Sequence, residues 1–89
     1  MCSSDLLRDA IDRVDEVLVR LLNQRAKYAV EIGELKGLLG LPIYAPDREK
    51  QVLQHAEATS AGPLETAAMR RLFERIIDET RRVEREASQ

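Results

Sequence analysis

The sequence has little of several residue types on which common protein functions depend. It contains one cysteine, Cys2, and one histidine, His55, among 89 residues. A disulfide framework, a metal cluster and a histidine-based triad therefore lack their residues, so we expect an inert Cys2 and an exposed, helical His55. Glycine-rich phosphate-binding motifs and the HExxH motif are also absent. Their absence argues against a nucleotide-binding fold and a zinc enzyme, and we expect no cofactor.

Long apolar segments and an excess of positive charge are missing as well. No apolar run approaches the roughly 18 residues of a membrane span, and the N-terminus lacks the apolar region of a signal peptide. We therefore expect a cytoplasmic protein that binds no membrane. The net charge of -2 argues against a nucleic-acid partner, because phosphate binding usually needs a basic face. Hydrophobic residues at 44% exclude a disordered chain, although aromatics at 3% leave little bulk for a core.

What is present is a helical pattern that predicts an all-α protein with a single domain, residues 1–89. Turn residues mark only two boundaries, at 37–42 and at 60–63, and no segment has the alternation of a strand. The first helix is predicted to begin after Ser4 or Asp5, either of which can cap it, and to run to about Leu39. This organisation predicts three helices in one chain.

The first helix is too long for a compact monomer. About 35 residues at roughly 1.5 Å each make a rod of about 50 Å, whereas a globule of this size is roughly 30 Å across. Apolar residues line one side of the rod in steps of three and four: Leu7, Ile11, Val14, Leu18, Leu21, Ala29, Ile32 and Leu39. This stripe needs a partner, and we predict an obligate homodimer with intertwined helices.

The two shorter helices have clear signals at their starts. The second is predicted from Pro46, which suits the first helical position, and the third from Pro63 or Leu64. The outer face of the third helix carries arginines that we expect to be solvated and paired with acids one turn away. They are Arg70, Arg71, Arg75, Arg81, Arg82 and Arg85.

Two cations interrupt the apolar stripe of the first helix. Arg25 and Lys36 are 11 residues apart, which at about 100° per residue returns to within roughly 20° of the same direction. Two cations on one buried face are costly unless an anion lies between them. The pattern leaves two interpretations open: an anion-binding site, or internal salt bridges with Glu31 or Glu49.

The third helix has a complementary feature. Ile76, Thr80 and Glu84 are spaced by four, so that a hydroxyl and a carboxyl extend an apolar row. A buried carboxyl favours its protonated form and can then donate a hydrogen bond. The alternative, which is favoured from this pattern alone, is that Glu84 reaches solvent at the chain end or pairs with Arg25.

Three further residues are candidates for the same anion-binding site. Arg48 and Glu49 begin the second helix, from which their side chains can reach the same interior. Arg8 lies 17 residues before Arg25, about 100° away around the helix, and cannot point into the same pocket within one chain. It can reach the pocket of a partner across a dimer.

Together these residues resemble the all-helical class of chorismate mutase over about Leu6 to Glu84. Each motif is weak alone, but their order and spacing are specific. The motifs are Leu-Arg at 7–8 with Ile11 and Asp15, Leu-Leu-Asn-Gln-Arg at 21–25, Lys36, Pro-Ile-Tyr-Ala-Pro-Asp-Arg-Glu at 42–49, and Leu-Phe-Glu-Arg-Ile-Ile at 72–77 followed by Thr80 and Glu84.

The resemblance implies an isomerase of aromatic amino-acid biosynthesis in the shikimate pathway. It implies an intertwined dimer of three-helix subunits that converts chorismate to prephenate without a cofactor. The implied catalytic residues are Lys36, Glu84 and Arg25. The implied substrate-binding residues are Arg25, Lys36, Arg48, Glu49, Thr80 and Glu84 from one chain and Arg8 from the other.

Two departures and three alternatives accompany this hypothesis. Family members often have an acid where this chain has Ala45, and some have Gln where it has Glu84. The alternatives are an isochorismate pyruvate lyase of the same fold, a non-catalytic helical dimerisation module, and a mutase activated by another shikimate-pathway enzyme.

Overall fold

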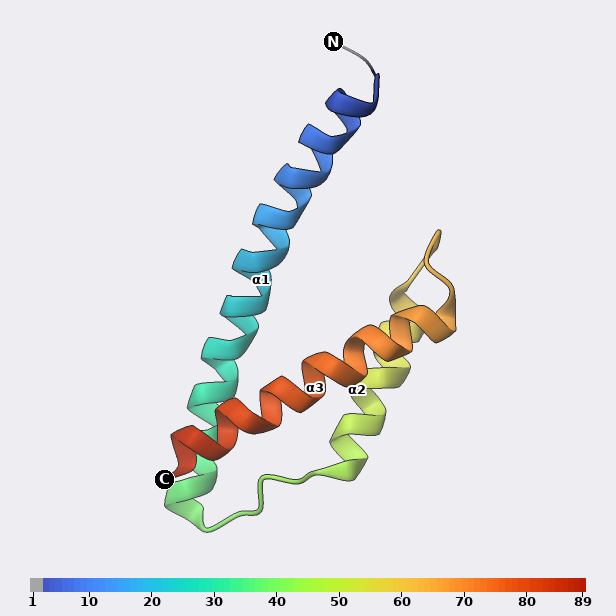
Figure 1. The fold of residues 1–89 in the computed structure, drawn as a ribbon. Coiled ribbons are helices and arrows are strands. Elements are labelled where there is room, and N and C mark those ends of the chain that lie inside the picture. Colours follow the sequence, from blue (N-terminus) through green and yellow to red (C-terminus); the bar gives the residue numbers. More distant parts are fainter. Residues whose placement is uncertain (1–2) are drawn as a thin grey trace.

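The computed structural model describes residues 3–89 as three helices joined by two short connections (Figure 1). Helix α1 covers Ser3–Leu39, α2 covers Pro46–Thr59, and α3 covers Thr66–Ser88. The all-α prediction is therefore confirmed. The expectation about Cys2 concerns a residue outside the described range, whereas His55 is exposed on α2 as expected.

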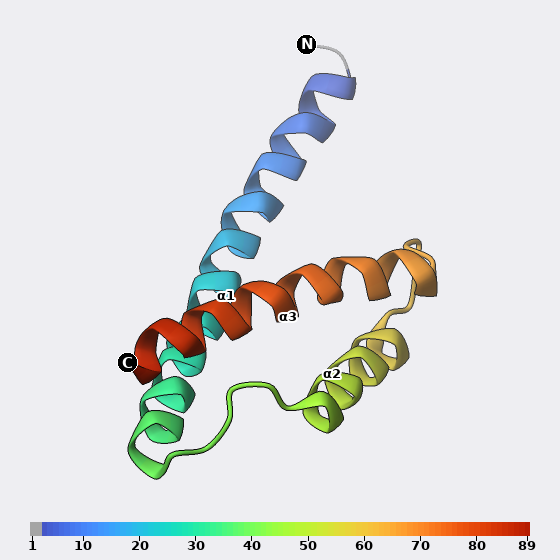
Figure 2. The ribbon, with the colours of Figure 1, turned by 60° about the horizontal axis from the view of Figure 1, so that its bottom comes forward.

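Helix α1 is the rod that its sequence predicts. The chain measures 57 Å along its longest axis, and its radius of gyration is 16.3 Å, against about 12 Å for a compact chain of this length. In Figures 1 and 2 the N-terminal half of α1 extends well beyond the other two helices. The helix starts at Ser3, one or two positions before the predicted cap, which is within the usual uncertainty of helix ends.

The start of α2 matches its prediction and the start of α3 does not. Pro46 occupies the first turn of α2, with Asp47 and Glu49 as favourable acids at the positive end of the helix dipole. Helix α3 begins at Thr66 rather than at Pro63 or Leu64. Gly62 has a φ of 85°, which turns the chain away from a helical path, and the next residues are used to reverse its direction.

Helix α3 holds the fold together. It packs against the C-terminal part of α1 and against α2, whereas α1 and α2 have no Cα atoms within 8 Å of each other over the described residues. Among the described residues, the buried hydrophobic ones are few: Ala29, Ala56 and Ile77. A single chain therefore buries only a small core around the crossing of α3.

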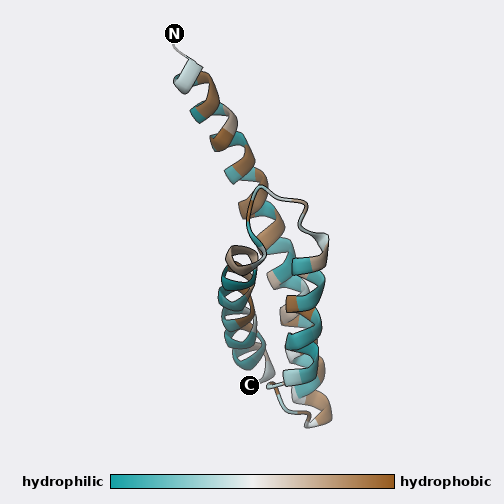
Figure 3. Cartoon of the chain, turned by 90° about the vertical axis from the view of Figure 1, so that its right-hand side faces the viewer, coloured by the Kyte–Doolittle hydropathy of each residue, from teal (hydrophilic) through white to brown (hydrophobic). Residues whose placement is uncertain are grey.

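The N-terminal half of α1 has no cover in one chain. Its hydrophobic residues recur along the projecting part of the helix (Figure 3). Leu7, Ile11, Val14 and Leu18 are each about half exposed or more. Such a long apolar face on a single chain indicates an interaction surface. No helix among the described residues is long and apolar enough to cross a membrane.

Candidate active site

A pocket of about 230 Å³ lies between the C-terminal half of α1, the connection at 40–45, the start of α2 and the C-terminal half of α3. Six of the seven predicted site residues line it: Arg25, Lys36, Arg48, Glu49, Thr80 and Glu84. Its apolar wall comes from Ala29, Ile32, Ile43, Val52 and Ile77. The structure thus brings together residues that are separated by up to 59 positions in the chain.

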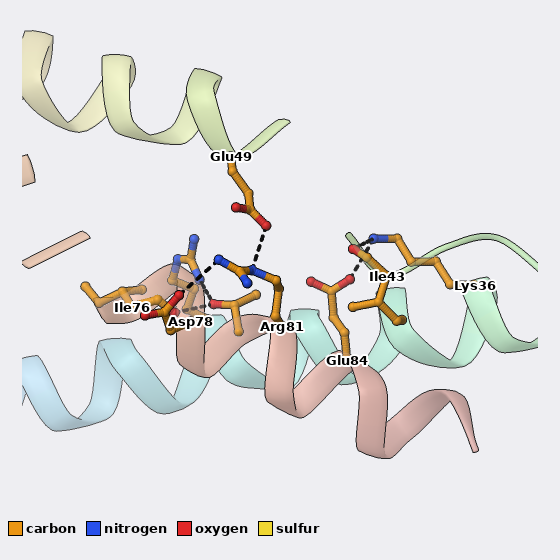
Figure 4. A network of polar contacts seen from close by, with 9 residues as sticks. Lys36, Ile43, Glu49, Ile76, Asp78, Arg81 and Glu84 are labelled. Atoms are coloured by element: carbon orange, nitrogen blue, oxygen red, sulfur yellow. Dashed lines mark hydrogen bonds and ion pairs between the residues drawn. The ribbon is translucent and has the colours of Figure 1, made fainter. Parts of the chain in front are cut away.

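Glu84 and Lys36 form an ion pair at one end of the pocket. Lys36 Nζ donates to Glu84 Oε1 at 2.8 Å and to the carbonyl oxygen of Ile43 at 3.3 Å (Figure 4). Glu84 is buried, with 7% of its surface exposed. The interpretation that Glu84 reaches solvent or pairs with Arg25 is therefore wrong, as is the pairing of Lys36 with Glu31 or Glu49. Whether Glu84 acts as a protonated donor stays a prediction.

Gly33 of α1 allows Glu84 to come this close, and Gly37 allows the end of α3 to approach α1. A Cβ atom at Gly33 would lie 2.8 Å from Glu84 Cα, and one at Gly37 would lie 3.0 Å from Ser88 Cα. Both distances are shorter than the roughly 3.5 Å of an ordinary carbon–carbon contact. The glycines interrupt the helical pattern in the sequence because α3 crosses α1 at this point.

Arg25 lies further toward the N-terminal end of α1 and binds α3. Its Nη1 donates a hydrogen bond to Thr80 Oγ1, and Thr80 in turn donates to the carbonyl oxygen of Ile76 at 2.8 Å. Burial lowers the pKa of Arg25, the neighbouring Arg48 lowers it further, and Glu84 opposes the change. Arginine stays charged at neutral pH despite such a shift, so two cations repel each other here in the absence of an anion.

Arg81 is a pocket residue, so its predicted place on the solvated outer face is wrong, although it pairs with an acid one turn away, Asp78, as expected. Its side chain is only one third exposed, with Nε 2.8 Å from Glu49 Oε2, although this ion pair lacks hydrogen-bond geometry. The signal was present in the sequence. Arg81 follows the buried Ile77 by four residues and precedes the buried Glu84 by three, so that it shares their face of the helix.

Arg8 does not belong to the pocket of its own chain. It lies on the exposed N-terminal half of α1, 17 residues from Arg25, which is about 25 Å along the helix axis. This agrees with the expectation that Arg8 cannot reach the site within one chain. Its predicted place in the site of a partner chain stays a prediction.

The charges that line the pocket do not cancel. Four cations (Arg25, Lys36, Arg48 and Arg81) face two carboxylates (Glu49 and Glu84), which gives 4 − 2 = +2. A dianion with two carboxylates matches this excess, and arginine forks suit carboxylates geometrically. The pocket is therefore chemically suited to a small dicarboxylate.

Comparison with known proteins identifies a matching family and similar relatives. The family model of chorismate mutase type II matches residues 7–85. A bifunctional chorismate mutase/prephenate dehydratase of Neisseria gonorrhoeae is 44% identical over 88% of the chain, and a T-protein of Enterobacter agglomerans is 46% identical over 64%. These alignments cover 21% and 16% of the relatives, so the chain spans about a fifth of the length of the curated relatives it matches.

Solved structures give a similar result over nearly the whole length of both chains. A chorismate mutase structure (form II) from Thermus thermophilus superposes with a TM-score of 0.87 and 38% identity. The match covers 90% of this chain and 91% of the other. From the family model and these relatives together, the chain belongs to the type II chorismate mutase family.

Proposed function

We propose that this chain catalyses the rearrangement of chorismate to prephenate as a step of aromatic amino-acid biosynthesis. The observation that carries the proposal is the pocket with a net charge of +2, assembled from all three helices. Chorismate is a dicarboxylate with a ring hydroxyl. Its rearrangement breaks one ether C–O bond and forms one C–C bond within the same molecule, so the proposed reaction uses no nucleophile, general base or cofactor.

The cations would position the substrate. Arg25 and Arg48 bind its carboxylates and hold the enolpyruvyl arm over the ring, a near-attack geometry that lowers the entropic part of the barrier. Burial and, after it, repulsion from Arg48 lower the pKa of Arg25, and the repulsion is relieved when a dianion binds. Thr80 and Glu49 orient a carboxylate and the ring hydroxyl.

Lys36 and Glu84 would stabilise the transition state. Negative charge develops on the ether oxygen as its bond to carbon breaks, and Lys36 donates a hydrogen bond to that oxygen. Glu84 would donate a second hydrogen bond to the same oxygen in its protonated form. Their 2.8 Å separation lets both groups reach one oxygen atom.

The proposed active form is a homodimer that covers the apolar half of α1. In this arrangement Arg8 of each chain would enter the site of the other. The proposal has a direct test in mixed dimers of Arg8→Ala and Lys36→Ala chains. Each variant alone is inactive, whereas about a quarter of all sites in a statistical mixture contain both native residues. A mixture without activity contradicts the shared site.

The central experiment incubates the purified protein with chorismate and identifies the products. Formation of prephenate supports the proposal, and the folded Arg25→Ala variant serves as the inactive control. Isochorismate is tested in parallel, because salicylate and pyruvate from isochorismate, without prephenate from chorismate, would identify a pyruvate lyase. Turnover of neither substrate favours a dimerisation module. We further propose one functional domain, located in the cytoplasm.

A further inference from the structure

Arg81 connects three parts of the chain at the edge of the pocket. It extends from α3 and forms an ion pair with Glu49 in the first turn of α2, Nε to Oε2, at 2.8 Å (Figure 4). Its guanidinium carbon lies 5.7 Å from the ring centroid of Tyr44 in the connection between α1 and α2, within the range of a cation–π contact. Its Nη2 donates to Asp78 Oδ1 at 3.0 Å on α3 itself.

This connection matters because no Cα atom of α2 lies within 8 Å of α1, which carries Arg25 and Lys36. The placement of α2 over the pocket depends on α3 and on the connection at 40–45. Arg81, which belongs to α3, contacts α2 through Glu49 and the connection through Tyr44. Holding Glu49 also holds the first turn of α2, from which Arg48 lines the pocket.

Because Glu49 is charged, the position of its carboxylate affects which ligands the pocket binds. A free carboxylate in this pocket competes with an anionic ligand for Arg25, Lys36 and Arg48. Arg81 engages Oε2 of Glu49 and thereby leaves the other carboxylate oxygen to accept one hydrogen bond. A neutral hydroxyl is the ligand group that donates such a bond without adding charge.

We infer that Arg81 is a positioning residue that fixes Glu49 and the connection at 40–45, so that the pocket binds dicarboxylates that carry a hydroxyl group. The inference rests on the proposed function for its substrate. A contact with the hydroxyl is made in the ground state and in the transition state alike, so its loss raises KM more than it lowers kcat. A loss of folded protein lowers the apparent kcat and leaves KM unchanged.

The test measures kcat and KM for Arg81→Met, Arg81→Lys, Glu49→Gln and the Arg81→Met/Glu49→Gln double variant. Arg82→Met is the matched control, because Arg82 is the adjacent residue, is 68% exposed and pairs only within α3, with Glu86. We expect Arg81→Met to lower kcat/KM by about 10- to 100-fold, chiefly through KM. Arg81→Lys keeps the charge and recovers part of the loss, while Arg82→Met resembles wild type.

The double variant shows whether Arg81 acts through Glu49. If it does, the double variant is about as impaired as the worse of the two single variants, because the second substitution removes nothing further. Two losses that multiply, or an Arg81→Met enzyme that matches Arg82→Met, overturn the inference.

If the wild-type protein does not turn over chorismate, the proposed function is refuted but the role of Arg81 is not. A second measurement then still tests that role. Amide hydrogen exchange at 41–45 and at the start of α2 reports the positioning directly. We expect exchange there to be about 10-fold faster in Arg81→Met than in Arg82→Met, because the local opening becomes easier. Equal exchange in the two variants overturns the inference independently of any activity.

Discussion

Gly33→Ala tests whether the close approach of α3 to α1 creates the site. The new Cβ atom would lie 2.8 Å from Glu84 Cα and 3.0 Å from Ala87 Cβ, both on α3. An ordinary carbon–carbon contact needs about 3.5 to 4.0 Å, so α3 must move away by about 1 Å. The hydrogen bond of 2.8 Å between Lys36 and Glu84 would lengthen by a similar amount, beyond the range of a good hydrogen bond.

Two opposing free energies determine the stability of this variant. Alanine in place of glycine inside a helix stabilises by about 1 kcal/mol, whereas overpacking at a close contact costs about 1 to 3 kcal/mol. We therefore expect a net destabilisation between about 0 and 2 kcal/mol, a change that a folded protein tolerates. Activity is more sensitive, because a 1 Å displacement of a catalytic group costs about 100-fold in rate.

The assay combines urea unfolding, followed by circular dichroism, with steady-state turnover of chorismate. The matched control is Gly37→Ala, whose Cβ approaches Ser88 at the last residue of α3, where the helix end can shift without moving Glu84. We expect Gly37→Ala to keep most of its activity. A Gly33→Ala protein with the full stabilisation of about 1 kcal/mol and native kcat/KM would refute the close-packing argument.

Three further predictions address charge, hydrogen bonding and assembly. Arg25→Ala remains folded by circular dichroism and loses turnover, because its charge serves the ligand, whereas unfolding of this variant would favour a structural role. Glu84→Gln keeps a hydrogen-bond donor at this position and retains turnover, whereas Glu84→Ala removes the donor and loses turnover; equal turnover of the two variants contradicts this role. Leu18→Asp places a charge on the apolar stripe of α1 and abolishes the dimer in light scattering, with loss of helical signal; a monomeric, folded wild type contradicts the assembly.

The sequence alone was informative where local periodicity decides the structure. The long first helix, the proline at the start of α2 and the apolar stripe follow from residue types at spacings of three and four, which chain geometry converts into helix faces. The same periodicity exposed Arg25 and Lys36 as polar residues on an apolar face. Both line the pocket, as do the other residues assigned to this chain's site.

The errors occurred where a position depends on contacts between helices. The start of α3 was placed two or three residues early, because Gly62 turns the chain before the helix begins. Arg81 was assigned to solvent because acids one turn away explain an arginine locally, and no local pattern shows that α2 brings Glu49 within 2.8 Å. The ion-pair partner of Lys36 does not follow from local spacing for the same reason, since Glu84 is 48 residues away in the sequence.

The scarcity of cysteine and histidine argues against a disulfide framework, a metal cluster and a histidine-based triad, and the helical periods predict the three helices and most of their inward faces. Only the tertiary structure decided how those faces meet. Gly33 lets α3 approach α1 closely at Glu84, which lies buried beside Lys36, while Arg81 on the same helix lies at the pocket edge. Helix faces follow from 1.5 Å steps along one chain, whereas ion pairs across helices depend on crossings that only packing determines.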